Sequence, residues 1–290
     1  MIIKNISFVG LGVMGYPMAG HLKKSGYIVK VFNRTESKAQ KWVKEYGGQM
    51  GKTPADACSE ADLIFMCVGR DEDIIEVMEG NNGILSSIKK GTIIVDHTTA
   101  SAEIARKYFE KLKKIDVAFL DAPISGGQAG AENGVLSIMI GGESKDFEIV
   151  KPVLKSYGKA IELIGDSGSG QIAKMINQIC IAGLVQGLSE AMAFGKKANV
   201  DMEKVLSVIS KGAAQSWQME NRYRTMLDGK FDYGFAVDWM RKDLSICFNE
   251  ANKNGASLPI TEIVDKYYAE VQKNGGNRLD TSSLMTLIDK

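Results

Sequence analysis

Residues 167–178 have the sequence SGSGQIAKMINQ, and an apolar run continues from this stretch to about Lys197. The run predicts a helix of roughly 40 Å, because each helical residue adds ~1.5 Å along the axis. Apolar side chains occur on every side of it, which is typical of a helix that is buried or crosses a membrane. Polar residues interrupt the run too often for a membrane span, which needs ~20 apolar residues. We therefore expect a buried helix where an α/β half gives way to a helical half.

Three polar residues near the start of this helix, Lys174, Asn177 and Gln178, are spaced so that they share one face. A lysine is seldom fully buried unless it is paired or functional. Because burial disfavours the charged ammonium, a buried lysine titrates closer to the range that is useful for proton transfer. The alternative is a lysine whose stem is buried and whose head stays in water. Lys174 is therefore a candidate general acid or base, with Asn177 beside it.

The composition fits a globular chain of two domains, with 290 residues, 44% hydrophobic residues and a formal net charge of +1. Such a charge gives no reason to expect nucleic acid or an anionic membrane as a partner. The four cysteines lack metal-binding spacing and predict free thiols in a reducing compartment, with neither disulfides nor a metal site. No signal or transit sequence precedes the first strand, so we expect a cytoplasmic protein.

A glycine-rich turn follows the first apolar run, which extends from Ile6 to Val9. A helical pattern and a second apolar run over residues 27–32 come next, and this order is typical of a dinucleotide-binding domain. In such a turn the first glycine permits a tight bend, the second lets a pyrophosphate approach the backbone, and the third lets helix and strand pack closely. The pyrophosphate lies at the helix N-terminus. The predicted cofactor-binding residues of this turn are Gly10, Leu11, Gly12, Val13, Met14 and Gly15.

The second strand ends in Asn33, Arg34 and Thr35, and we predict that all three contact the cofactor. An NAD-specific site usually places an acid here to bind the ribose 2′-hydroxyl, but the first acid in this stretch is Glu36. Arg34 instead offers a planar guanidinium that suits a 2′-phosphate. We therefore expect NADP as the cofactor, with NAD as the alternative if Arg34 is only a solvated loop residue.

Two further apolar runs, residues 63–68 and 92–95, predict parallel strands that are covered on both faces. Ligands bind beyond the carboxyl ends of such strands. We therefore predict that Val68, Gly69 and Thr99 contact the cofactor. His97 is a candidate catalyst, although we favour the interpretation of a loop histidine without a special role.

A later strand near Asp121 leads into a proline-bounded loop that contains Ser125, Gly126 and Gly127. A hydroxyl followed by consecutive backbone N–H groups can form an anion-binding concavity. These three residues are therefore predicted to bind a substrate carboxylate, the alternative being an ordinary turn.

Four stretches now occur in order: GLGVMG at 10–15, DAPISGG at 121–127, GSGQIAKMINQ at 168–178 and MRKDL at 240–244. Together they closely resemble the β-hydroxyacid dehydrogenase family, which includes 3-hydroxyisobutyrate dehydrogenase and the tartronate, glyoxylate and succinic semialdehyde reductases. The resemblance implies a Rossmann-type domain, a long interdomain helix and a helical domain that dimerises. It matches Lys174 to the catalytic lysine, Asn177 to the amide beside it, and residues 125–127 to the loop that binds the substrate carboxylate. It matches Lys242 to a lysine near nicotinamide and substrate.

Two departures from related enzymes narrow the function. The resembling 6-phosphogluconate dehydrogenases carry a glutamate two turns beyond the lysine for decarboxylation, where this chain has Ile181. Imine reductases resemble the same architecture but generally lack the lysine. Arg34 resembles the NADPH-preferring reductases, whereas the loop at residues 125–134 resembles the 3-hydroxyisobutyrate dehydrogenase branch, so the substrate stays open.

The sequence thus predicts an α/β Rossmann domain over residues 1–165, an interdomain helix over 166–197 and an all-α domain over 198–290, assembled as a homodimer or homotetramer. We expect an NAD(P)-dependent dehydrogenase that transfers a hydride between nicotinamide and a small 3-hydroxy acid or semialdehyde. The alternative enzyme is an NADPH-dependent glyoxylate/succinic semialdehyde reductase. The non-enzyme alternative is a cofactor-binding scaffold, which would need neither Lys174 nor Asn177.

Overall fold

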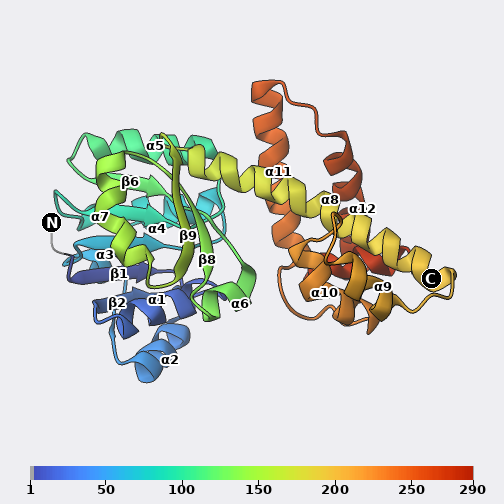
Figure 1. Ribbon diagram of the computed structural model, residues 1–290. Helices are drawn as coiled ribbons and strands as arrows, with labels where there is room; N and C mark the ends of the chain where they lie inside the picture. The colour runs from blue at the N-terminus through green and yellow to red at the C-terminus, as the bar shows by residue number, and fades with distance from the viewer. Residues whose placement is uncertain (1–2, 290) are drawn as a thin grey trace. The chain divides into compact units, whose positions relative to one another are not determined.

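The computed structural model describes residues 3–289 and divides the chain into two compact units, residues 1–174 and 175–290 (Figure 1). The first unit contains one sheet whose strand order is β3-β2-β1-β4-β5-β6-β8-β7, with β9 paired to β8. Its strands are β1 (Asn5–Val9), β2 (Ile28–Phe32), β3 (Gln49–Met50), β4 (Leu63–Met66), β5 (Ile93–Asp96), β6 (Ala118–Asp121), β7 (Ile124–Ser125), β8 (Leu136–Gly141) and β9 (Gly158–Gly165). All pairs are parallel except those that join β8 to β6 and to β7.

Helices cover both faces of this sheet, which makes it the doubly wound Rossmann-type architecture that the sequence predicts (Figure 1). One hydrophobic cluster joins the strands to α1, α2, α6 and α7, and a second joins them to α3, α4 and α5. The helices are α1 (Gly15–Lys24), α2 (Glu36–Tyr46), α3 (Pro54–Cys58), α4 (Asp71–Glu79), α5 (Ala102–Lys113), α6 (Gly127–Glu132) and α7 (Ser144–Leu154), with a short 3-10 turn, η1 (Ile84–Ser86).

Strand β4 shows how burial selects the sheet's residues. Each residue of Leu63–Met66 is fully buried, as expected for a parallel strand covered on both faces. The strand ends two residues earlier than predicted. Cys67 N–H still donates to Val9 O at 2.9 Å, but Val68 N–H donates to the hydroxyl of Thr98 at 3.0 Å and no longer to a strand carbonyl. Since β1 lies between β2 and β4, successive strands are added first on one side of β1 and then on the other, and such a switch point is where open α/β sheets bind ligands.

The second unit is helical in its described part. Its helices are the continuation of α8 (Ser169–Lys197), then α9 (Met202–Ile209), α10 (Trp217–Leu227), α11 (Val237–Asn254) and α12 (Pro259–Lys273), followed by the 3-10 segment η2 (Thr281–Leu287). The apolar periodicity of residues 281–288 predicts an α-helix, and this prediction is wrong because the segment is a 3-10 helix. The side chain of Asp280 accepts a hydrogen bond from Ser282 N–H, and its carbonyl accepts one from Ser283 N–H, which fixes the tighter turn.

The prediction that the long helix is buried on all sides is also wrong. On α8 the side chains of Ile176, Leu184 and Phe194 are 59%, 44% and 77% exposed. By length and mean hydropathy alone, α8 is the one described helix that would be able to cross a membrane. Its polar residues Gln171 and Gln178 are buried and hydrogen bonded within the first and the second unit, respectively.

Candidate functional site

The glycine-rich turn between β1 and α1 is held by close backbone contacts. Gly10 N–H donates a hydrogen bond to Phe32 O at 2.9 Å. Gly10 has a φ of +99°, and a Cβ there would collide with the carbonyl of Cys67. A Cβ on Gly15 would collide with the carbonyl of Gly10. The fold itself therefore requires glycine at both positions.

Gly12 differs from its two neighbours in the turn. Its φ is not positive and a Cβ would meet no protein atom within 4 Å, so neither backbone conformation nor packing requires glycine there. The N-terminus of α1 has no side-chain cap and no acid in its first turn. Exposed N–H groups and the helix dipole favour an anion at such a terminus. The turn, with Val13 exposed and Leu11 buried, therefore fits the pyrophosphate of a dinucleotide.

Asn33 joins this turn to the end of β2. Its side-chain oxygen accepts a hydrogen bond from Leu11 N–H at 2.9 Å, and its amide donates to Thr35 O at 2.9 Å. Arg34 extends into solvent, with a side chain that is 91% exposed, and lies 3.6 Å from Asp73 at the start of α4. Asn33 therefore lies directly against the glycine-rich turn, and Arg34 and Thr35 follow it at the end of β2.

The carboxyl ends of β4 and β5 are joined by Thr98. Its hydroxyl accepts a hydrogen bond from Val68 N–H at 3.0 Å, and its own N–H donates to Asp96 Oδ1 at 2.9 Å. Val68, Gly69 and Thr99 are all partly exposed beside these contacts. Burial raises the pKa of the Asp96 carboxyl to about 7.

Asp121, at the end of β6, fixes the start of α8. Its carboxylate accepts hydrogen bonds from Gly168 N–H at 2.7 Å and from Gln171 N–H at 3.0 Å, so it caps the helix N-terminus. Burial raises the pKa of this carboxyl, and the N–H groups oppose the rise. The side chain of Gln171 then binds the loop after β5, which ties the helix to the sheet edge.

Lys174 lies one helical turn beyond Gln171 and is only 8% exposed. Spacing of three residues places both side chains on the same face of α8. A lysine with so little exposure is uncommon in a folded protein. The structure therefore places the predicted general acid or base at the same end of the first unit as the strand ends and the glycine-rich turn.

His97 is a structural residue of the first unit. It is 1% exposed, and its two ring nitrogens lie 2.6 Å from Ala122 O and 2.8 Å from Tyr157 Oη. Because a carbonyl can only accept, Nδ1 carries the proton and Nε2 accepts from Tyr157. Burial lowers the pKa of His97 to about 4, which keeps the ring neutral. The interpretation as a histidine without catalytic role fits this geometry.

The stretch from Ser125 to Gly127, which the sequence predicts to be a loop, contains the end of a strand and the start of a helix. Ser125 belongs to β7 and pairs with Ser137 of β8, while Gly127 begins α6. Gly126 and Gly127 have φ values of +129° and +61°, and Gly127 is exposed. Both φ values lie in the region that favours glycine, and the turn leads directly into the N-terminus of α6.

In the second unit a buried polar chain connects α8 to α11. Asn177 donates to Gln178 Oε1 at 2.7 Å, and Gln178 donates to Asp243 Oδ2 at 2.6 Å. Asp243 also forms an ion pair with Lys242 at 2.8 Å, and Lys242 lies over the ring of Trp239. The structure thus brings together Asn177 and Lys242, which the family resemblance names as site residues.

Three functional candidates were not predicted from the sequence. Asp121, Gln171 and Asp243 are buried polar side chains that hold the site elements in place. Gln171 could have been found from the sequence because it is a polar residue at the start of a largely apolar run. Asp121 and Asp243 lie inside the stretches that carry the family resemblance, where only their neighbours had been assigned roles.

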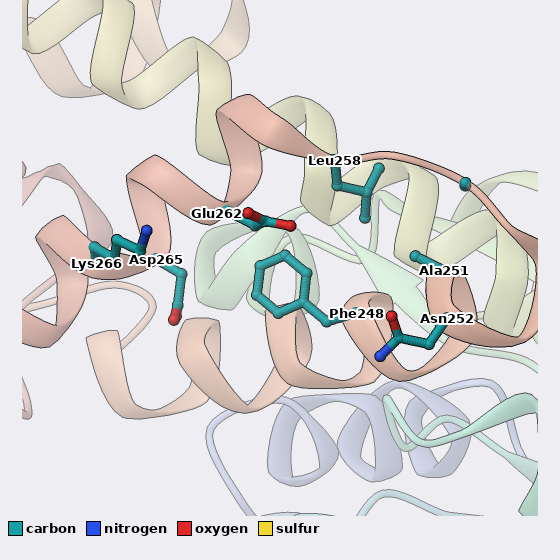
Figure 2. Close-up of a pocket in the computed structure, with 8 residues that line it drawn as sticks. Phe248, Ala251, Asn252, Leu258, Glu262, Asp265 and Lys266 are labelled. Atoms are coloured by element: carbon teal, nitrogen blue, oxygen red, sulfur yellow. The ribbon is translucent and has the colours of Figure 1, made fainter.

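A surface depression of about 350 Å³ lies in the second unit between α11 and α12 (Figure 2). No predicted site residue lines it; its residues are Phe248, Ala251, Asn252, Ala256, Leu258, Glu262, Asp265 and Lys266. Among residues 3–289, no group of three histidine, cysteine, aspartate or glutamate side chains is arranged to hold a metal ion.

Comparison with known proteins identifies the class. Residues 5–165 match the family described as the NAD binding domain of 6-phosphogluconate dehydrogenase. Residues 168–288 match the family described as NAD-binding of NADP-dependent 3-hydroxyisobutyrate dehydrogenase. Together with the glycine-rich turn, these matches define an NAD(P)-dependent oxidoreductase.

Individual relatives span the whole chain. An uncharacterized oxidoreductase of Shewanella frigidimarina is 55% identical over 285 residues, with 98% of each chain covered. The 2-hydroxy-3-oxopropionate reductase of Escherichia coli is 33% identical over 284 residues, 98% of this chain and 97% of the relative. The structure of Mycobacterium tuberculosis 3-hydroxyisobutyrate dehydrogenase with L-serine has the same fold, with a TM-score of 0.88 at 24% identity over 100% of both chains.

The chain belongs to the β-hydroxyacid dehydrogenase family. It is therefore an enzyme of the 3-hydroxyisobutyrate dehydrogenase type, and the interpretation as a cofactor-binding scaffold without catalysis is not supported.

Proposed function

We propose that this enzyme interconverts a small 3-hydroxy acid and its semialdehyde, with Lys174 as the general acid and base. The observation on which this rests is the placement of Lys174. It is nearly buried at the first turns of α8, in the unit that also contains the glycine-rich turn and the carboxyl ends of β4, β5 and β6.

The chain's own residues have distinct tasks in this proposal. Residues 10–15 bind the pyrophosphate, and Ser125, Gly126 and Gly127 bind the substrate carboxylate. Lys174 donates a proton to the oxygen of the aldehyde during reduction and accepts it during oxidation, while Asn177 orients the lysine head and the same oxygen. Lys242 adds a positive charge near nicotinamide and substrate. The bound nicotinamide supplies or accepts the hydride.

NADP is the proposed cofactor, with NAD as the alternative. Arg34 supports NADP because its exposed guanidinium lies beside the residues that border the glycine-rich turn. A guanidinium binds phosphate through two parallel hydrogen bonds, whereas the NAD-type alternative would use a carboxylate at this edge.

The substrate class is a short hydroxy acid such as 3-hydroxyisobutyrate. The similarity to 2-hydroxy-3-oxopropionate reductase and the shared fold with a 3-hydroxyisobutyrate dehydrogenase that binds L-serine both support a three- or four-carbon acid. Glyoxylate and succinic semialdehyde are the alternative substrates, and Arg34 favours them as substrates of an NADPH-dependent reductase.

Initial rates would test the proposal. NADPH and NADH are each measured against semialdehydes and glyoxylate, and NADP and NAD against 3-hydroxyisobutyrate and serine. Lys174→Ala should reduce kcat by ~10²–10⁴-fold, as expected for loss of general acid–base catalysis, while the Kd for NADPH stays unchanged. Lys204→Ala, at a lysine that is 85% exposed on α9, is the matched control. Full turnover in Lys174→Ala would rule out the assigned role.

We further propose a cytoplasmic homodimer or homotetramer. Exposed apolar side chains on α8, among them Ile176 and Leu184, support association with a second copy. Light scattering of the purified protein would measure the mass directly, and a mass of 31.6 kDa for the particle would contradict the oligomer.

A further inference from the structure

The side chain of Gln171 forms hydrogen bonds with the loop after β5, at the residues before and after Thr99. Its Oε1 accepts a hydrogen bond from Ala100 N–H at 3.0 Å, and its Nε2 donates to Thr98 O at 2.7 Å. Gln171 is 1% exposed, so neither bond competes with bulk water. The peptide segment that presents Thr99 is thereby fixed to the first turn of α8.

The helix end of this contact is equally well fixed. The backbone N–H of Gln171 donates to Asp121, whose carboxylate is fully buried and also binds Gly168 N–H. A Cβ on Gly170 would approach backbone and side-chain atoms of Asp121 too closely, so this turn packs directly on the end of β6. These contacts fix the first turn of α8, which contains Gln171, against the end of β6.

The loop end is tied to the neighbouring strand as well. Thr98, whose carbonyl accepts from Gln171, accepts a hydrogen bond from Val68 N–H through its hydroxyl. One buried amide thus joins the ends of β4, β5 and β6 to the helix that contains Lys174, three residues further along the same face.

We propose that Gln171 is a positioning residue that sets the separation between Thr99, which is predicted to contact the cofactor, and Lys174. The inference rests on the proposed function of Lys174 and deepens it. Hydride transfer and proton transfer act on adjacent atoms of one substrate, so the group that fixes the nicotinamide side relative to the lysine controls the rate of both. A misplacement of about 1 Å can lower the rate ~10²-fold.

An uncharged amide is required because the two backbone groups have opposite needs. Thr98 O needs a donor and Ala100 N–H needs an acceptor, and a glutamine side chain provides both at once. Methionine has similar length and can satisfy neither need. An ionised glutamate can satisfy Ala100 only and would repel Thr98 O, whereas a protonated glutamate restores both hydrogen bonds.

The first experiment compares Gln171→Met with Gln186→Met. Gln186 is on the same helix, 8% exposed, and bonds only to Glu190 among the contacts of the described residues. Gln171→Met should lower kcat ~10²-fold, change the Kd for NADPH less than threefold, and raise the primary isotope effect with 4-deuterated NADPH. Gln186→Met should leave kcat and the isotope effect as in the wild type.

The second experiment uses Gln171→Glu and needs no apolar substitution. The charged and titratable side chains near this position, which set the pKa of the new carboxyl together with burial, are Asp71, Asp96, Arg106, Asp121 and Lys174. We expect kcat of Gln171→Glu, divided by kcat of the wild type at the same pH, to be ~10⁻² at pH 9. This ratio should rise at least tenfold as the pH falls to 6. This recovery would report protonation of residue 171, which a loss of packing would not produce.

The outcomes separate this inference from the proposed function. Wild-type kcat and isotope effect in Gln171→Met, or a ratio for Gln171→Glu that does not vary with pH, would overturn the positioning role while Lys174→Ala still lowers kcat by ~10²–10⁴-fold. If Lys174→Ala keeps full activity, the proposed function itself is wrong. Should Gln171→Met fail to fold, the pH series of Gln171→Glu alone decides the question.

Discussion

The backbone N–H of Leu11 donates a hydrogen bond to the side-chain oxygen of Asn33 at 2.9 Å. This contact joins the glycine-rich turn after β1 to the end of β2. The amide of Asn33 also donates to Thr35 O, so its side chain is held on both sides. The position of the expected pyrophosphate site is thereby coupled to the position of the ribose edge.

Asn33→Asp should shift the cofactor preference from NADPH toward NADH. The carboxylate keeps the acceptor for Leu11 N–H but loses the donor to Thr35 O and places a negative charge beside the expected 2′-phosphate. An acid at this edge is the usual partner of an NAD ribose. We expect kcat/KM with NADPH to fall at least tenfold, with a smaller change for NADH. Equal losses with both cofactors would contradict a ribose-edge role for Asn33.

Gly12→Ala should weaken cofactor binding without loss of stability. Nothing within 4 Å of the added methyl group belongs to the protein, and the backbone conformation is ordinary. Alanine also gives the unfolded chain less conformational entropy than glycine does, so less entropy is lost on folding. The Tm should therefore stay the same or rise slightly. The Kd for NADPH, measured by fluorescence titration, should increase at least tenfold because the methyl group occupies the side from which the pyrophosphate approaches.

Gly15→Ala is the matched control for Gly12→Ala. Its added methyl group would meet the carbonyl of Gly10 and the ring of Phe8, so the fold should be destabilised by ~1–3 kcal/mol, as is usual for overpacking. An unchanged Kd in a folded Gly12→Ala variant would show that the turn does not approach a pyrophosphate.

Much of the fold was predictable because its elements have strong local patterns. The apolar patterns of the sequence predict a strand over residues 136–141 and a helix over residues 217–227. Strand β8 and helix α10 have these bounds, because both patterns lie in consecutive residues. Helix α6 was not predicted. Its sequence, GQAGAE, has no apolar stripe. The helix packs against β8, where the side chain of Leu136 lies close to Gly126 and Gly130.

The site was predictable only where short stretches contain its chemistry. Lys174 and the residues of the glycine-rich turn stand out by their neighbours in sequence. The role of Gln171 does not, because its partners Thr98 and Ala100 are 73 and 71 residues away in the chain. Likewise, the burial of α8 depends on tertiary contacts, so the apolar residues on every side of the run did not reveal that Ile176 and Phe194 are exposed.

Asp96→Asn should stabilise the protein at alkaline pH. Burial raises the pKa of Asp96 from 3.8 to about 7 in the folded state, and the nearby carboxylates of Asp121 and Asp71 add to the rise. The folded protein therefore binds a proton between about pH 4 and pH 7 that the unfolded chain has released. As a result, the contribution of Asp96 to the free energy of unfolding decreases as pH rises through this window and stays constant above it.

Asparagine removes this pH dependence and keeps an oxygen that can accept from Thr98 N–H, which Asp96 binds at 2.9 Å. Urea unfolding at pH 8 should show Asp96→Asn to be more stable than the wild type by on the order of 3 kcal/mol, with the difference vanishing near pH 4. A difference that is the same at pH 4, 6 and 8 would mean that Asp96 does not titrate in this range.

Arg34→Leu should remove the preference for NADPH. The Arg34 side chain is 91% exposed and has one ionic neighbour among the described residues, Asp73 at 3.6 Å. An exposed pair of this separation contributes little to stability, so the substitution should leave the Tm unchanged. A charged hydrogen bond to a phosphate is worth roughly 1.5–3 kcal/mol, and kcat/KM with NADPH should therefore fall about 10- to 100-fold while the value with NADH changes less than threefold.

Asp73→Asn provides the opposite change at the same pair. It removes a negative charge near the expected 2′-phosphate and frees the guanidinium, so kcat/KM with NADPH should rise two- to fivefold, and most strongly at low ionic strength, where surface charges are least screened. In the double variant Arg34→Leu/Asp73→Asn this gain should disappear, because Asp73 acts on the phosphate mainly through Arg34. If Arg34→Leu lowers kcat/KM equally with both cofactors, Arg34 does not bind the 2′-phosphate. The similarity of residues 125–134 to the 3-hydroxyisobutyrate dehydrogenase branch then becomes the better guide to cofactor and substrate.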